Sequence, residues 1–393
     1  MLVRDHQLLE GGGLAGAQPV KEARRVACLR LSHGKTIPRP GSSRVEMPVA
    51  ARAERAPNRR GKLRGIMTKR ERVLSAARRG PVDRPPVSFW RHVPDVDHTA
   101  AGLAEAMLAF QRRWDLDFVK VMSSGVYCVE DWGCRVAYQG SPNGAKQCTE
   151  HAVRTRADWA RIGPLDPGAG ALGRELEAVR LIARGRADDA PILHTLFSPL
   201  TVARKLAGDR LVEDLRAEPA AVEPALDAIT DTMARHARAA LHAGADGFFF
   251  ATQTAAPEVV TLEEVTRFEL PRMRRILDAV AGRSTLTLLH VHGRDVYFDQ
   301  AAALPVHAMN WHDRLTTPRL GDGHRRFAGA VVGGLSEHRT LQAGPPDAVA
   351  AEVRDAIAQT GGRGVMIGPG CVLPLATPDA HLAAVVAAVK AAA

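Results

Sequence analysis

The sequence predicts an α/β fold, a (β/α)8 TIM barrel, for residues 67–393. Eight short apolar runs occur between Pro86 and Gly368, and helical patterns separate most of them. Strand–helix units that alternate eight times over about 300 residues are typical of this barrel. A doubly wound sheet with an inserted piece is the alternative. It needs a phosphate-binding glycine loop after an early strand, and no G-x-G-x-x-G or Walker-type motif occurs there.

A basic segment, residues 1–66, precedes the predicted barrel. It is rich in Gly, Ala, Arg and Pro and has no sustained period, so we expect a disordered extension. It holds 14 of the 53 Lys and Arg residues but only 5 of the 43 Asp and Glu residues. The body is therefore nearly neutral, which argues against a nucleic-acid partner. The segment fits a basic arm, a targeting peptide or translated upstream sequence, and we interpret Met67 as the biological start.

The elements of the barrel can be placed in order. A first helix is expected after Thr68, because Glu71 lies three residues later and the two can form a capping box. The expected strands are the apolar runs at 86–90, 117–122, 191–196, 246–251, 286–291, 306–311, 329–334 and 364–368. The clearest helical patterns cover residues 101–114, 219–243, 261–280 and 345–360.

Apolar runs and cysteines also bear on location. No run of about 18 apolar residues is present, so no membrane span is expected. The N-terminus lacks the contiguous apolar stretch of a secretory signal. Five cysteines are a sparse, odd set that fits a reducing cytoplasm better than a disulfide framework. Cys128, Cys134 and Cys148 have no C-x-x-C spacing, and we expect them to be inert.

The stretch LLHVHGRD, residues 288–295, ends the fifth apolar run with two histidines. Residues i and i+2 of a strand point to the same side, so His290 and His292 should project together. Two imidazoles on one face can bind a metal, share a proton or hold a substrate. The plain alternative is a pair of hydrogen-bonded histidines at a polar strand end.

Polar residues at the carboxyl ends of barrel strands are the natural candidates for a site, because those ends form one mouth. Lys120, His312 and Asp313 are candidate catalytic residues; the alternatives are a solvated lysine and a salt-bridged strand end. His194 is a candidate for substrate binding or a buried core histidine. The other candidates for substrate binding are Arg91, His92 and Gln253, and Cys371 follows the eighth run.

Several segments resemble one known superfamily over residues 67–393. They are MTKRERVLSAARRGPVDRPPVSFWRH, SPLTVARKLAG, AGADGFFFATQ, GGLSEHRTL and IGPGCVLPLATPDAHLAAVV. The chain resembles the uroporphyrinogen decarboxylase superfamily, which also contains zinc-dependent methyltransferases acting on methyl-corrinoids and thiols. The resemblance implies a (β/α)8 barrel with the active site in its mouth.

The decarboxylase branch fits the chain poorly at its functional positions. Arg91 falls on the first of the branch's two substrate-binding arginines, but Asp95 falls on the second. Ser124 falls on the essential aspartate, Lys205 on the active-site tyrosine and Gly370 on or beside the late histidine. A substrate with eight carboxylates needs organised cations. We therefore expect little or no uroporphyrinogen decarboxylase activity.

The methyltransferase branch fits better. Its pattern His-x-Cys-Gly places His290 on the family histidine and His292 on the family cysteine, and Cys371 lies in the Pro-Gly-Cys turn. The resemblance implies a zinc ion bound by these three residues and methyl transfer from a methyl-corrinoid substrate to a small acceptor. No Asp-x-His-x-x-Gly corrinoid motif is present, so a corrinoid would arrive free or on a partner protein.

Other functions stay open on the sequence. A lyase could decarboxylate a non-porphyrin acid with Arg91 and Lys120, and a non-catalytic member could only bind a corrinoid or porphyrin-like ligand. We expect a soluble cytoplasmic enzyme with a small-molecule substrate, and a homodimer remains open.

Overall fold

The computed structural model describes residues 65–392, so the predicted extension, 1–66, lies almost wholly outside the described residues. Seven parallel strands form one sheet in the order β1-β4-β5-β6-β7-β8-β9. They are β1 (Val119–Lys120), β4 (Ile192–Phe197), β5 (Gly247–Thr252), β6 (Leu286–Val291), β7 (Ala308–Trp311), β8 (Ala330–Leu335) and β9 (Val365–Pro369). Each falls on one of the apolar runs that the sequence marks as strands.

The first predicted strand, residues 86–90, closes the ring. Val87 makes a parallel bridge with Ile367 of β9. The amide of Ser88 donates to the Ile367 carbonyl at 3.1 Å, and the amide of Asp117, just before β1, donates to the Val87 carbonyl at 2.9 Å. The segment therefore pairs with both edges of the sheet, and the predicted (β/α)8 barrel is confirmed.

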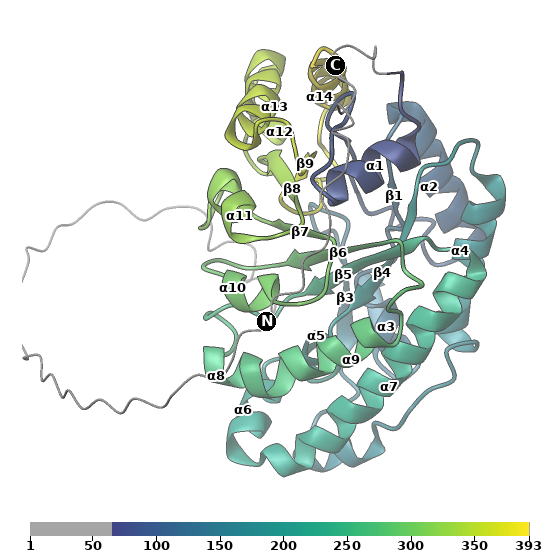
Figure 1. The fold of residues 1–393 in the computed structure, drawn as a ribbon. Helices are drawn as coiled ribbons and strands as arrows, with labels where there is room; N and C mark the ends of the chain where they lie inside the picture. The colour runs from purple at the N-terminus through teal and green to yellow at the C-terminus, as the bar shows by residue number, and fades with distance from the viewer. Residues whose placement is uncertain (1–64, 393) are drawn as a thin grey trace, which may run out of the picture. The chain divides into compact units, whose positions relative to one another are not determined.

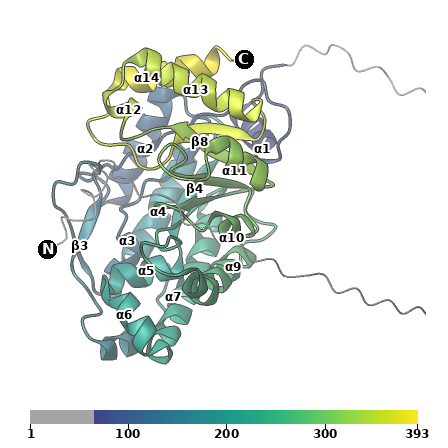
Figure 2. The same ribbon diagram turned by 90° about the vertical axis from the view of Figure 1, so that its left-hand side faces the viewer.

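Helices surround the strands (Figures 1 and 2). The Thr68–Glu71 capping box is present and begins α1 (Lys69–Ala77), as predicted. The four predicted helical patterns correspond to α2 (Ala100–Trp114), α7 (Pro219–Ala243), α9 (Leu270–Asp278) with the turns before it, and α13 (Pro346–Thr360). The other longer helices are α4 (Gly170–Gly185), α5 (Pro199–Ala207), α6 (Arg210–Ala217), α11 (Leu320–Arg326) and α14 (Asp379–Lys390). None in the described part is long and apolar enough to cross a membrane.

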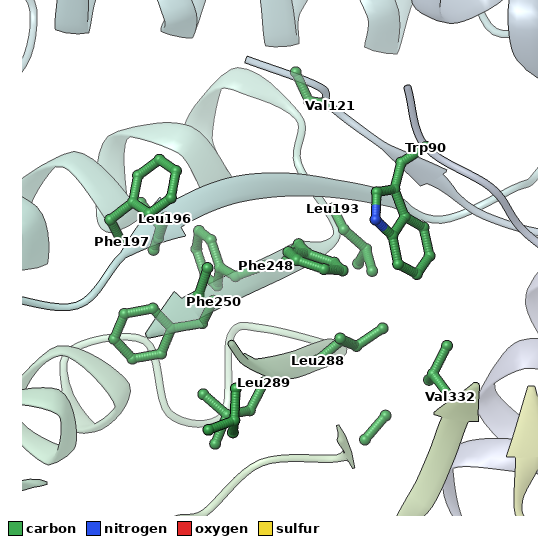
Figure 3. Close-up of a cluster of buried hydrophobic side chains, with 14 of the residues drawn as sticks. Trp90, Val121, Leu193, Leu196, Phe197, Phe248, Phe250, Leu288, Leu289 and Val332 are labelled. Carbon is green, nitrogen blue, oxygen red and sulfur yellow. The ribbon is translucent and has the colours of Figure 1, made fainter. Parts of the chain in front are cut away.

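The strands are buried on both faces, which explains why they read as continuous apolar runs. Figure 3 shows side chains of β4, β5 and β6 packed together with Trp90 from the segment that closes the ring. Trp90 meets Phe249 of β5 edge-on with ring centroids 5.2 Å apart. Phe249 in turn stacks on His290 at 5.5 Å. The apolar core therefore reaches directly to the histidine pair.

A two-stranded hairpin lies in the long connection between β1 and β4, where the sequence does not predict one. It consists of β2 (Arg135–Tyr138) and β3 (Lys146–Glu150), which pair antiparallel with an irregularity at Arg135 and Val136. Its residues are exposed or half-buried, so they lack the apolar pattern of the barrel strands. It follows the short helix α3 (Tyr127–Glu130).

Candidate metal centre

His290, His292 and Cys371 meet at one end of the barrel. His290 is in β6, His292 follows β6 directly, and Cys371 lies two residues after the end of β9. The Cys371 sulfur is 3.7 Å from Nε2 of His290 and 3.6 Å from Nδ1 of His292. Their three ligand atoms all lie within 4.8 Å of one another. The structure thus brings together the three residues that the family resemblance singles out.

Asn310 of β7 fixes the orientation of His290. The Asn310 amide nitrogen donates to the carbonyls of Val332 at 2.9 Å and Pro369 at 3.0 Å. Its oxygen must therefore face His290, whose Nδ1–H donates to it at 2.6 Å. With the proton on Nδ1, the Nε2 lone pair of His290 points toward the Cys371 sulfur. Such a partner fixes the tautomer of a metal-binding histidine.

His312 lies beside the three converging side chains. Its Nε2 is 3.1 Å from Nδ1 of His292, and its Nδ1 donates to a carboxylate oxygen of Glu337 at 2.8 Å. The second Glu337 oxygen accepts the amide of Gly370 at 3.2 Å. A Cβ at Gly370 would lie 3.0 Å from the His312 Cα, so glycine allows the turn to approach this closely. Glu337 thereby connects His312 by hydrogen bonds to the turn that contains Cys371.

The electrostatics favour an ionised sulfur. Burial favours the neutral thiol of Cys371, but the imidazoles around it hold its pKa well below the usual thiol value. Burial opposes protonation of His312, yet its contacts with Cys371 and Glu337 raise its pKa to about 10. Burial lowers the pKa of His292. A thiolate with nitrogen donors on either side is suited to hold a cation.

Lys120 and His92 are buried close to this cluster. The Lys120 ammonium lies 4.5 Å from the centre of the Phe249 ring and 2.9 Å from the Met122 sulfur. Burial lowers its pKa to about 7, and within residues 65–392 it has no carboxylate partner. Burial and the charge on Lys120 lower the pKa of His92 to about 3, so that ring is neutral. The Cys371 thiolate acts against this shift, and a buried ammonium paired with no carboxylate is a functional-site signal.

Gln253 and Arg91 lie near the mouth but outside the cluster. Gln253 follows β5, and its side-chain oxygen accepts the Lys205 ammonium at 2.7 Å. Arg91 points its guanidinium toward the Phe110 ring at 5.5 Å and the Leu375 carbonyl at 3.5 Å. With His92 it lines a surface hollow of about 420 Å³. Arg91 and Lys120 also line one small pocket of about 10 Å³, which has room for about one water molecule and not for a substrate carboxylate.

Two predicted residues take structural positions instead. His194 is in β4 but faces α7, where its Nε2 is 2.9 Å from Nε2 of His236, so its place does not support a role in substrate binding. Asp313 is buried and accepts the Gly334 amide at 3.1 and 3.2 Å. The carboxylate that contacts His312 is that of Glu337, and a catalytic role for Asp313 stays a prediction.

Asn310 and Glu337 are the residues that the sequence did not single out. Each is a polar side chain at or just after an otherwise apolar strand, Asn310 in AMNW and Glu337 in GGLSE. A buried polar residue in such a run needs a hydrogen-bond partner. This need was the sequence signal that could have identified Asn310 and Glu337.

The model of the uroporphyrinogen decarboxylase (URO-D) family matches residues 68–392. The chain belongs to this family. Named relatives of this URO-D protein fall into both branches of it. Methylcobamide:CoM methyltransferase MtbA of Methanosarcina acetivorans is 23% identical over 346 residues, covering 82% of this chain and 98% of the relative. Methylcobamide:CoM methyltransferase MtaA of Methanosarcina barkeri is 25% identical, covering 82% and 97%. A uroporphyrinogen decarboxylase of Yersinia pestis is 26% identical, also covering 82% and 97%.

A solved structure, a methyltransferase from Methanosarcina mazei, superposes with a TM-score of 0.70 at 23% identity. It covers 82% of this chain and 98% of its own. A B12-independent methionine synthase from Shewanella gives a TM-score of 0.52 at 13% identity, covering 78% of this chain and 98% of its own. Both support the fold of this URO-D family protein. Because overall identity is similar for the two branches, the site residues have to discriminate between them.

Proposed function

We propose that this URO-D family enzyme transfers a methyl group from a methylated corrinoid to a small acceptor, with zinc bound by His290, His292 and Cys371. The convergence of these three side chains at the barrel mouth is the observation that carries the proposal. Relatives named as methylcobamide:CoM methyltransferases support the reaction class. A corrinoid protein or a free corrinoid would deliver the methyl group, because the chain has no corrinoid motif of its own.

The donor set fits zinc. Catalytic zinc sites use three protein ligands, with bonds of about 2.0–2.1 Å to nitrogen and about 2.3 Å to sulfur. In a tetrahedron, those bonds place sulfur and nitrogen about 3.6 Å apart. The observed distances from the Cys371 sulfur are 3.7 Å to His290 and 3.6 Å to His292. The hydrogen bond from His290 to Asn310 leaves the correct nitrogen free.

The neighbouring side chains have separate tasks in this proposal. A zinc ion bound here supplies a Lewis acid that lowers the pKa of an acceptor thiol. Glu337 holds His312 with its Nε2 3.1 Å from the His292 nitrogen that would bind zinc. With that nitrogen on the metal, Nε2 of His312 would be free to take up the acceptor's proton. Lys120 binds an anionic group of the acceptor, because it is the buried cation without a carboxylate partner in the described part of the chain. Gln253 and the Lys205 ammonium border the same mouth.

The imidazole of His292 distinguishes this site from the thiolate of the family pattern. One thiolate fewer makes the ligand set less negative and the bound ion a stronger Lewis acid. The candidate acceptors therefore include oxygen and nitrogen compounds as well as thiols, and a test must cover all three.

The proposal is tested with purified protein, its metal content and methylcobalamin as donor. Loss of methylcobalamin absorbance should require both bound zinc and one acceptor from a panel of small thiols, amines and alcohols. A zinc-loaded protein that leaves methylcobalamin unchanged with every acceptor, while a methylcobamide:CoM methyltransferase assayed in parallel consumes it, would contradict the proposal. Turnover of an acid to carbon dioxide after complete removal of metal would favour the lyase alternative.

A further inference from the structure

A second cluster of metal-binding side chains lies away from the barrel mouth cluster. Cys134 precedes β2, Cys148 is in β3 and His151 follows β3. One ligand atom of each lies within 4.8 Å of the others. Cys134 is buried and Cys148 is half-buried, and both have free thiols. Their spacing in the sequence did not predict this cluster, which forms because the hairpin brings residues 134 and 148 together.

One backbone carbonyl faces the whole cluster. The Lys205 oxygen, in the last turn of α5, lies 3.0 Å from Nδ1 of His151, 3.3 Å from the Cys148 sulfur and 3.8 Å from the Cys134 sulfur. Carbonyls in the last helical turn lack intrahelical donors, so this oxygen is free to bind. The amide of Ala152 donates to the Cys134 sulfur at 3.4 Å, so this sulfur is a hydrogen-bond acceptor.

Hydrogen bonding alone accounts poorly for this geometry. A carbonyl oxygen has two lone pairs, and here two thiols and an imidazole converge on it. The two sulfur–oxygen distances, 3.3 and 3.8 Å, lie on either side of the edge of about 3.5 Å between a sulfur and an oxygen ligand of one tetrahedral ion, whereas the 3.0 Å between His151 and the oxygen is a hydrogen-bond distance. A disulfide between Cys134 and Cys148 is the competing use of the two sulfurs.

We propose that Cys134, Cys148 and His151 bind a second zinc ion, with the Lys205 carbonyl oxygen completing the donor set. Two thiolates and one imidazole are donors that zinc prefers. The three side chains all come from the hairpin and its flanks, whereas the carbonyl comes from α5. The ion therefore fastens the hairpin to the barrel. An isolated two-stranded hairpin is marginally stable in water, so such a link has a clear physical purpose.

The second ion also affects the barrel mouth, through the backbone of Lys205. The carbonyl of Lys205 faces the cluster, while its ammonium donates to Gln253 at 2.7 Å and lies over the Phe197 ring at 4.9 Å. Holding the backbone of Lys205 thus positions a cation at the mouth. The site is structural, and its existence does not depend on the reaction proposed above.

Zinc analysis of the full chain and five variants tests the inference. After dialysis against a weak chelator, the unaltered chain should hold two zinc ions. Cys371→Ser and Cys148→Ser should each hold one, and the double variant should hold none. Cys128→Ser, which changes a buried cysteine of α3 outside the cluster, is the matched control and should hold two. His151→Gln should behave like Cys148→Ser and guards against an effect peculiar to the cysteine.

Cobalt(II) replacement separates the two sites without an activity assay. Sulfur-to-cobalt absorption should persist in Cys371→Ser, because two thiolates remain, and should weaken more in Cys148→Ser. Limited proteolysis of the loop at 139–145 should be faster in Cys148→Ser than in the control. A Cys371→Ser chain that folds but binds no metal would overturn the second site, as would a Cys134–Cys148 disulfide in protein isolated without reductant. Zinc lost from Cys148→Ser but unaffected by Cys371→Ser would support the second site and contradict the catalytic one.

Discussion

Asn310 lies directly opposite His290 in the β6–β7 pair and decides which nitrogen of that imidazole faces Cys371. Its own orientation is fixed by two backbone carbonyls, those of Val332 in β8 and Pro369 in β9. The side-chain amide of Asn310 in β7 therefore connects His290 of β6 to the backbones of β8 and β9. The tautomer of His290 is a consequence of the barrel's register rather than of any local contact along β6.

Asn310→Ala should weaken metal binding without unfolding the protein. The His290 ring would lose the acceptor of its Nδ1 proton, and both its orientation and its tautomer would become variable. Loss of such a partner lowers metal affinity roughly 10–100-fold. Competition with a coloured chelator measures the change, and Asn143→Ala in the β2–β3 loop is the control. Unchanged affinity at the Cys371 site would show that the amide has no role in metal binding.

Glu337→Gln should lower turnover while leaving the zinc content intact. The neutral amide still fills the space beside His312 and Gly370 but no longer stabilises a positive charge on the imidazole. We expect methyl transfer to fall roughly 10-fold or more, since proton transfer by a positioned group contributes about 10²–10⁴-fold. Zinc content and the melting temperature distinguish this from a structural effect. A variant with normal turnover would remove His312 from the proposed proton exchange.

The barrel strands were predictable because parallel strands covered by helices bury both faces and read as apolar runs. The hairpin was not, because its residues are exposed or half-buried and show no alternation. Its Cys134 and Cys148 sit 14 positions apart, and only the antiparallel pairing brings them together. Spacing along the chain could not reveal that cluster.

The candidate site at the barrel mouth was also only partly predictable from the sequence. His290 and His292 follow from the period of a strand, and Cys371 from a turn at the same end of the barrel. His194 is the third of six residues in β4, and its side chain faces α7, where it contacts His236 as a buried core histidine would. Asn310 and Glu337 act through partners on other strands, and these depend on the register between strands.

The protein should form little or no coproporphyrinogen from uroporphyrinogen. Ser124 is buried at the position that the family resemblance gives to the essential aspartate, and Asp95 carries the wrong charge for a substrate carboxylate. Product analysis beside a uroporphyrinogen decarboxylase measures this directly. A rate of coproporphyrinogen formation comparable to that of the uroporphyrinogen decarboxylase would show that the protein functions as a decarboxylase.

Cys371→Ser should lower metal content and methyl transfer together. The substitution removes the thiolate from the barrel mouth but leaves both histidines and the β9 turn in place. A hydroxyl is a far weaker zinc ligand than a thiolate, so zinc occupancy of the barrel-mouth site and activity should fall in proportion. Cys128→Ser is the control, because Cys128 is buried in α3 and takes part in neither cluster. Full activity in Cys371→Ser with the barrel-mouth site empty of metal would contradict the proposed mechanism.

Lys120→Met should make the fold more stable and the enzyme less active, with the stability gain depending on pH. Burial lowers the pKa of Lys120 to about 7, whereas an unfolded lysine titrates near about 10.4. Between these values the unfolded chain binds more protons, so the destabilising effect of Lys120 is largest below pH 7 and fades as pH rises toward 10. Methionine matches the size of the side chain without its charge.

Denaturation of Lys120→Met and the unaltered chain at pH 6 and at pH 10 measures this difference. We expect a stability gain on the order of a few kcal/mol at pH 6, since each unit of pKa shift corresponds to about 1.4 kcal/mol. The gain should be much smaller at pH 10. Lys69→Met is the control: Lys69 pairs with Asp115 and Asp188, so its loss should destabilise the fold slightly. Because Lys120 is assigned to the acceptor's anionic group, the KM for an anionic acceptor should rise in Lys120→Met. A stability gain with unchanged KM would mean that the buried ammonium serves another ligand.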